Sequence, residues 1–215
     1  MRHNPATVVV LAGHASQGLL SAVSRSMNVS LVTPEGGADG GPGGPGGPSD
    51  VIEAAAGALR RAAGISSPYV LVTADPLAQV AAQWQAMWEI AAEPRGSEAF
   101  ELAAAQALAA WRAKRFELPD YYLVLAADGA AEENFYLGPL RSVRPHRVSV
   151  VAAAESAPAE QAAGLLSALG SLRQGRWWPP LAEVLDVARR FYPGALAQAV
   201  PGNRLPAAVA QERSG

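Results

Sequence analysis

Cysteine is absent from the 215-residue chain. Its absence excludes disulfides, iron–sulfur clusters, thiolate zinc sites and thiol nucleophiles. The three histidines, His3, His14 and His146, are too scattered for a metalloprotease pair at helical spacing. Lys114 is the only lysine and falls in an expected helix, so a Walker-type or cofactor-linked lysine after a strand is excluded. Several large classes of enzyme are thereby removed.

Long apolar runs and a strong net charge are also missing. No window approaches eighteen consecutive apolar residues, and the short apolar run near the start is typical of a strand rather than a signal peptide. We therefore expect a cytoplasmic protein that has no membrane partner. A formal net charge of −2 is too small to indicate a nucleic-acid partner.

Five apolar segments rich in β-branched residues recur along the chain. They span residues 7–12, 27–33, 69–74, 121–127 and 147–153. Continuous apolar strands are typical of a parallel sheet that is covered on both faces. Helical patterns separate them, with two consecutive helices between the third and fourth strands. The sequence therefore predicts an α/β fold: a three-layer Rossmann-like sandwich with a mainly parallel sheet of about five strands, an inserted helix pair and extra C-terminal helices.

One domain is expected over residues 1–199, followed by a disordered tail over residues 200–215. Within the domain, residues 34–49 carry three Gly-Gly-Pro triplets. Glycine and proline disfavour both helix and sheet, so this segment predicts a flexible loop. Because it follows the carboxyl end of a strand, a mobile flap over a site is the alternative.

The loop after the first strand is the strongest candidate for a ligand site. Its sequence, Gly13-His-Ala-Ser-Gln-Gly18, lacks the lysine and hydroxyl of a Walker loop and the G-x-G-x-x-G pattern of dinucleotide binding. Glycines still allow close backbone approach, and a helix N-terminus attracts anions. We therefore predict that a nucleotide or other small anionic ligand binds here, with a tight structural turn as the alternative. The predicted ligand-binding residues of the loop are Gly13, His14, Ser16, Gln17 and Gly18.

Asp75 and Asp128 complete the predicted ligand site, because both follow expected strands at their carboxyl ends. The alternatives are a helix cap for Asp75 and a turn for Asp128. Ser16 resembles half of a nucleophile elbow, but His146 is expected at the opposite end of the sheet, so no catalytic triad is predicted. No acidic spacing indicates a metal site. Whether the protein is an enzyme, and which cofactor it takes, stay open.

Two further segments carry chemistry. Residues 141–147 form the densest basic cluster, which suits either a phosphate clamp or a solvated turn paired with nearby acidic residues. The Trp177-Trp178-Pro-Pro sequence cannot easily bury both indoles, and Trp177, Trp178 and Arg176 are the predicted residues of a protein interface. The alternative function is accordingly a non-catalytic scaffold or partner-binding, self-associating protein, which uses the helix pair and this Trp-rich region.

Overall fold

The computed structural model describes residues 6–34, 48–89, 95–126, 133–152 and 157–191. A five-stranded sheet lies at its centre, with the order β2-β3-β1-β4-β5 and every neighbouring pair parallel. The prediction of a parallel α/β sheet is therefore confirmed. The strands are β1 (Thr7–Ala12), β2 (Val29–Val32), β3 (Tyr69–Val72), β4 (Tyr121–Ala126) and β5 (Val148–Ala152).

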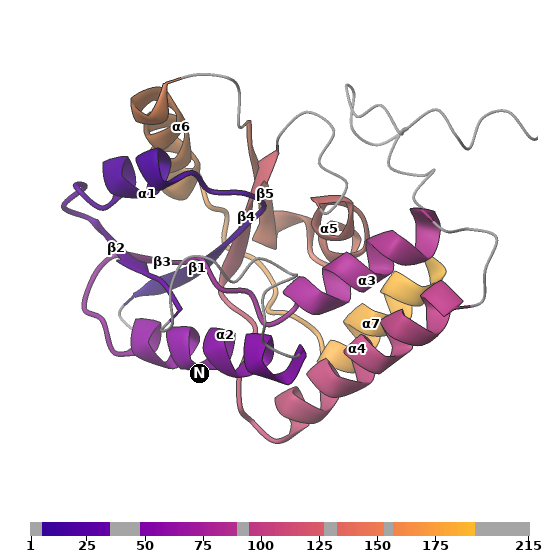
Figure 1. Ribbon diagram of the computed structural model, residues 1–215. Helices are drawn as coiled ribbons and strands as arrows, with labels where there is room; N and C mark the ends of the chain where they lie inside the picture. The colour runs from indigo at the N-terminus through magenta and orange to yellow at the C-terminus, as the bar shows by residue number, and fades with distance from the viewer. Residues whose placement is uncertain (1–5, 35–47, 90–94, 127–132, 153–156, 192–215) are drawn as a thin grey trace, which may run out of the picture.

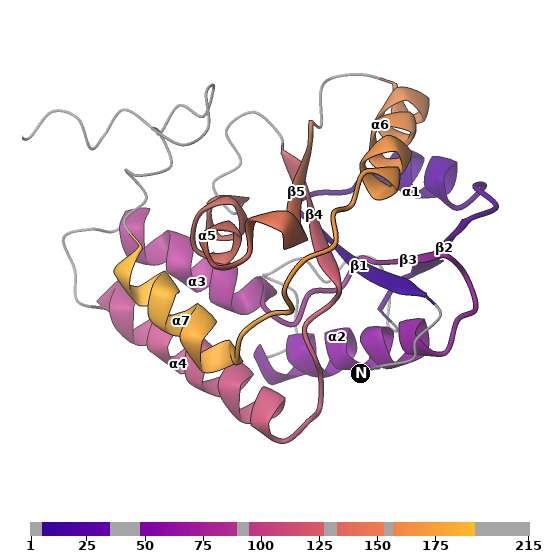
Figure 2. The ribbon, with the colours of Figure 1, turned by 180° about the vertical axis from the view of Figure 1, so that it is seen from behind.

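Helices cover both faces of the sheet and make a three-layer sandwich (Figures 1 and 2). Helices α1 (Gln17–Val23) and α6 (Pro158–Gly170) pack together on one face. The opposite face carries α2 (Pro48–Ala63), α3 (Ala78–Glu89), α4 (Arg95–Arg112) and α7 (Leu181–Arg190). Among the residues described between β4 and β5 are the short helical segments η2 (Tyr136–Leu140), α5 (Arg141–Val143) and η3 (Pro145–Arg147). In the parts of the chain that the structure describes, no helix is long and apolar enough to cross a bilayer.

Each face of the sheet has its own apolar core, which explains the lack of alternation in the strands. Val9 and Leu11 of β1 pack in one core with Leu165 of α6. Val8 and Val10 of the same strand belong to the other core, which contains the side chains of the four-helix face. Because both faces are buried, every position of the strand favours an apolar residue.

Helix starts differ slightly from the sequence prediction. Asp50 and Ser97 have the sequence pattern of helix caps, whereas α2 begins at Pro48 and α4 at Arg95. Residues 35–47 of the predicted flexible loop and the predicted tail over 200–215 lie outside the described residues. The segment before β5 contains η2, one turn of π-helix with Pro139 inside it.

Candidate functional site

The carboxyl edge of the sheet contains a topological switch point. β1 lies between β3 and β4, and the chain leaves β1 toward α1 on one face. It leaves β3 and β4 toward α3 and η2, whose buried side chains belong to the core on the other face. Neighbouring loops therefore diverge at β1, and parallel α/β sheets bind their ligands in the crevice that such a divergence creates. The predicted loop of residues 13–18 starts there.

Gly13 is held in a conformation that only glycine adopts easily. Its φ is +92°, in the left-handed region. A Cβ atom on Gly13 would lie 2.8 Å from the carbonyl oxygen of Leu125 and 3.4 Å from Oε1 of Glu133. The loop is thus packed closely against the end of β4 and against a carboxylate from the segment that follows it. His14 and Gln17, two of the predicted ligand residues, are exposed.

Ser16 and Gly18 have structural partners within the loop's surroundings. Ser16 is the N-cap of α1, and its hydroxyl accepts a hydrogen bond from the Leu19 amide at 3.2 Å. Gly18 faces the start of α6, because a Cβ there would lie 2.9 Å from Cγ of Pro158.

His146, the candidate catalytic base, lies in η3 at the amino end of β5, where its ring donates to the Arg176 carbonyl. Ser16 and His146 therefore occupy opposite edges of the sheet.

The Asp75 carboxylate is buried and accepts hydrogen bonds from three segments of the chain. Its Oδ1 accepts hydrogen bonds from the Leu77 amide and the Tyr122 hydroxyl, both at 3.0 Å, and its Oδ2 accepts one from Tyr136 at 2.5 Å. Burial raises the pKa of Asp75, against the opposing effect of hydrogen bonds from Tyr136, Leu77 and Tyr122. Burial also raises the pKa of the Tyr122 hydroxyl, and the charge of Asp75 adds to the increase. The aspartate thus ties the turn after β3 to β4 and η2.

Glu133 and Asn134 were not predicted as site residues, yet both are buried. Besides the approach of Glu133 to Gly13, Asn134 Nδ2 donates to Oε1 of Gln85 on α3 at 3.4 Å. The only feature of the sequence that could have indicated Glu133 and Asn134 is their position after β4. Asp128 lies outside the described residues. Among the residues that the structure does describe, no three His, Asp or Glu side chains cluster as metal ligands.

The basic cluster binds the protein's own main chain. Residues 173–177, hereafter the strap, cross the amino edge of β4 and β5. Arg147 donates to the carbonyls of Gly175 and Arg176 in the strap at 3.0 and 2.7 Å, and to that of Asp120 at 2.7 Å. Arg144 donates to the Trp177 carbonyl at 2.7 Å. Burial lowers the pKa of Arg147.

The Trp pair is divided between core and surface. The Trp178 indole is buried and donates to the Pro119 carbonyl at 2.8 Å. Trp178 is therefore corrected from an interface residue to a core residue. Trp177 is 46% exposed and stacks on the Arg147 guanidinium, whose Cζ lies 4.5 Å from the ring centroid. Arg176 is exposed and contributes its carbonyl to the strap contacts.

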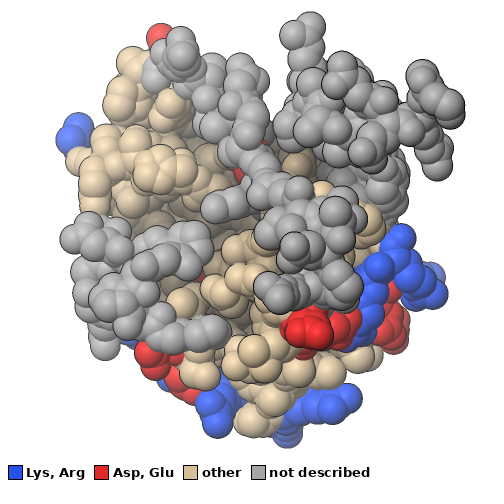
Figure 3. Space-filling model, turned by 45° about the vertical axis from the view of Figure 1, so that its right-hand side comes forward, with Lys and Arg blue, Asp and Glu red and all other residues tan. Residues whose placement is uncertain are grey.

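The remaining exposed apolar side chains do not gather around Trp177. Among the described residues, the large exposed hydrophobic side chains are Met27, Leu102, Val150 and Trp177, each in a different segment. On the face drawn in Figure 3, acidic and basic side chains lie next to one another over the lower part. An ion-pair network joins α4 to α7, where Arg189 pairs with Glu101 and Asp186. Isolated exposed apolar residues are normal on monomeric surfaces, so they do not by themselves indicate an interface.

The chain matches no protein-family model, and no curated protein or solved structure was found to match it.

Proposed function

We propose that the protein binds a small phosphorylated, hydroxyl-bearing ligand of the nucleotide class, across the loop of residues 13–18. The observation that carries this proposal is the packing of the Glu133 carboxylate against the left-handed Gly13, at the switch point of the sheet. A backbone without a side chain and a neighbouring acceptor group together suit a ligand that approaches the main chain closely.

The charges around the loop determine how such a ligand would lie. A phosphate would be repelled by Glu133, whereas sugar hydroxyls donate hydrogen bonds to a carboxylate. The hydroxyl end therefore belongs near Gly13. His14 and Gln17 are exposed further along the loop and carry N–H donors that suit phosphate oxygens. The proposed ligand thus presents its hydroxyls at the Gly13 end and its phosphate toward His14 and Gln17.

Catalysis is not part of the proposal. The two oxygens of Asp75 already accept three hydrogen bonds, and the Ser16 hydroxyl caps α1. Asp75 and Ser16 thus make hydrogen bonds that stabilise the described part of the fold, so binding is the activity that the loop supports best.

Thermal shift with the full chain tests the proposal. Nucleoside monophosphates and sugar phosphates are compared with the matching nucleosides and free sugars, each up to millimolar concentration. We expect at least one phosphorylated compound to raise Tm by about 5–10 °C at a hundredfold excess over its Kd, because binding to the native state alone stabilises it.

Matched glutamine variants locate the binding. Gln17→Ala is expected to reduce the shift, whereas Gln174→Ala, an exposed glutamine in the strap, leaves it unchanged. If phosphorylated and unphosphorylated compounds raised Tm equally, the placement of the phosphate toward His14 and Gln17 would be wrong. The absence of any shift across the panel would reject the proposal.

A further inference from the structure

The strap is fixed to the fold through its main chain, which leaves its side chains exposed. Four of its five carbonyls accept a hydrogen bond, those of Arg173, Gly175, Arg176 and Trp177. The donors belong to β4 and to the residues just before β5: Tyr121, Arg144, His146 and Arg147. The side chains of Arg173, Arg176 and Trp177 are exposed. The strap is thus a fixed segment that presents two guanidinium groups and an indole to solvent.

The Trp177 indole is held in place by the residues beneath it. The Arg147 guanidinium lies against the ring, with Cζ 4.5 Å from the ring centroid, and Arg144 donates to the Trp177 carbonyl at 2.7 Å. The side chain is nevertheless 46% exposed. A ring that is already fixed loses little conformational freedom on binding, so its exposed surface suits a flat aromatic partner.

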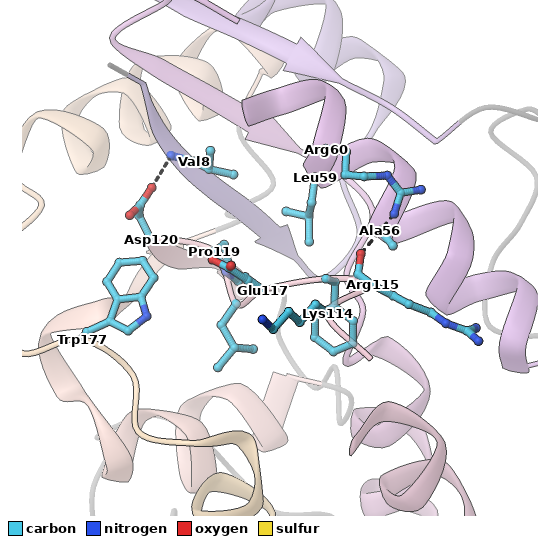
Figure 4. Close-up of a pocket in the computed structure, with 12 residues that line it drawn as sticks. Val8, Ala56, Leu59, Arg60, Lys114, Arg115, Glu117, Pro119, Asp120 and Trp177 are labelled. Carbon is cyan, nitrogen blue, oxygen red and sulfur yellow. Dashed lines mark hydrogen bonds between the residues drawn. The ribbon is translucent and has the colours of Figure 1, made fainter. Parts of the chain in front are cut away.

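Cations from other segments stand near this ring. A hollow of about 220 Å³ at the amino edge of the sheet is lined by Trp177 together with Arg60, Lys114 and Arg115 (Figure 4). The side chains of Lys114 and Arg60 point away from each other in Figure 4, so these charges are spread along the edge. Spread cations suit a partner that carries several separate anionic groups rather than one small anion.

Three cations have their charge available for such a partner. The side chains of Lys114, Arg173 and Arg176 are exposed and make no hydrogen bond or ion pair with any residue that the structure describes. Arg115, by contrast, is held in an ion pair at 2.6 Å, and Arg60 donates to the Arg115 carbonyl at 3.1 Å. The available charge therefore lies on the strap and just after the end of α4.

Two carboxylates that line the hollow limit where anionic groups can lie. Oδ2 of Asp120 accepts a hydrogen bond from the Val8 amide at 2.8 Å, which ties the start of β4 to β1. Glu117 is exposed and repels an anion on its side of the hollow. Anionic groups of a partner are thus expected outside the hollow, across Lys114 and the strap.

The surroundings of Trp177 indicate which kind of partner this surface fits. Protein interfaces have an apolar core within a polar rim. Among the described residues, however, the other large exposed apolar side chains lie in other segments: Met27, Leu102 and Val150. One exposed aromatic ring among cations is the combination with which proteins bind unpaired nucleic acids, because cations bind the phosphates and the bases stack on the ring. The formal net charge of −2 gave no sign of this surface, since it averages over the whole chain.

We propose that the strap binds single-stranded nucleic acid. An unpaired base stacks on the exposed part of the Trp177 indole, and the neighbouring phosphates bind Lys114, Arg173 and Arg176. This surface lies at the amino edge of the sheet, opposite the loop of residues 13–18, and the proposal does not depend on the function proposed for that loop. RNA and DNA share the chemistry that is recognised here, so both are compared in the test.

Fluorescence anisotropy with the full chain tests this assignment. The labelled probes are oligo-dT and oligo-U of about twelve nucleotides, within the range of common site sizes, and a mixed-sequence duplex of the same length. We expect at least one single strand to bind about fivefold or more tightly than the duplex, because paired bases cannot stack on the indole. The tighter of the two single strands assigns the partner to RNA or DNA, and equal affinities assign both.

Variants at Trp177 separate stacking from charge. Trp177→Ala is expected to weaken the binding of the preferred single strand about fivefold or more, whereas Trp177→Phe, which keeps an aromatic face, retains most of the affinity. The Tm of each variant shows whether the fold is kept.

A matched pair of arginine variants tests the phosphate contacts without disturbing the fold. Arg176 contributes its carbonyl to the strap contacts, so Arg176→Gln should leave Tm unchanged. It should make the slope of log K against log salt concentration less steep by about 0.7, as for one lost phosphate contact with a single strand. Arg190→Gln, an exposed arginine at the opposite end of α7 from the strap, should leave the slope unchanged. No binding of either single strand, equal binding of the duplex, wild-type affinity in Trp177→Ala, or equal slopes in the two arginine variants would each overturn the proposal.

Discussion

At the scale of single residues, Asp75 shows how one carboxylate joins distant segments. The Leu77 amide is local, but the Tyr122 and Tyr136 hydroxyls come from β4 and η2. The carboxylate is thereby fully hydrogen-bonded inside the core, which is the condition for burying such a group. Because burial raises its pKa, Asp75 also makes the stability of the fold depend on pH.

Asp75→Asn tests this dependence. In the unfolded chain the pKa of Asp75 is near its ordinary value of 3.8, and in the folded protein burial raises that pKa. Above pH 3.8 the native state therefore retains a proton that the unfolded state has lost, and the contribution of Asp75 to stability falls as pH rises through the folded pKa. The variant lacks this fall. We expect the stability of Asp75→Asn relative to wild type to increase between about pH 4 and pH 7, measured by urea unfolding.

A difference between the two proteins that stays constant with pH would contradict this prediction, as would one that changes in the other direction. Tyr136→Phe serves as the control, because it removes one hydrogen bond to Asp75 but leaves the titrating group in place.

The sequence revealed part of this arrangement. The Asp75-Pro76 pair predicted a cap, and the Leu77 amide does donate to the aspartate. A tyrosine inside a strand buried on both faces, as Tyr122 is, signals a need for a polar partner. The identity of that partner was beyond sequence reasoning, since 47 residues separate Tyr122 from Asp75. In the sequence, Glu133 is only one of several nearby acidic residues, because no local pattern indicates that it approaches Gly13.

At the scale of elements, the strap is held by side chains that act on carbonyl groups. Arg147 donates to two strap carbonyls and to Asp120, and Tyr121 donates to the Arg173 carbonyl at 3.1 Å. From the sequence, the cluster at residues 141–147 suited either a phosphate clamp or a solvated turn, because the main-chain carbonyls that Arg144 and Arg147 bind leave no mark in the sequence. Strands were easier to predict, since continuous apolar runs report burial on both faces directly.

Arg147→Met measures what these contacts contribute. Methionine keeps an unbranched side chain against Tyr121 and Trp177 but cannot donate to three carbonyls, so we expect the free energy of unfolding to fall by about 2–4 kcal/mol. Urea unfolding gives the value. Arg190→Met is the control, because Arg190 is exposed and should change stability by no more than about 0.5 kcal/mol. Equal effects of the two substitutions would show that the strap contacts are not stabilising.

At the scale of the whole molecule, α7, the last helix among the described residues, completes the core that the earlier elements leave open. The indole of Trp84 on α3 donates to the Ala188 carbonyl of α7 at 2.8 Å, across 104 residues. Leu181 and Leu185 of α7 are fully buried in the same core. The sequence predicted these helices but not the strand order, because parallel pairing through main-chain groups does not distinguish one apolar strand from another.

Leu185→Ala tests whether the described elements unfold as one unit. We expect a loss of about 2–5 kcal/mol, as for other buried leucines, with far-ultraviolet circular dichroism and tryptophan fluorescence shifted to the same new urea midpoint. Leu102→Ala, at a leucine that is 60% exposed, should have little effect. Midpoints that separate between the two signals in Leu185→Ala would indicate that α7 unfolds independently of the sheet.

The strap's reliance on main-chain acceptors has an evolutionary corollary. Every amino acid supplies the same C=O group, so positions 173, 174 and 176 can change their side chains freely without loosening the amino edge of the sheet. Gly175 is the exception, because any added Cβ would collide with the His146 ring. As far as the fold alone requires, related proteins would therefore keep an arginine at position 147 and a glycine at position 175, while the other side chains of the strap vary.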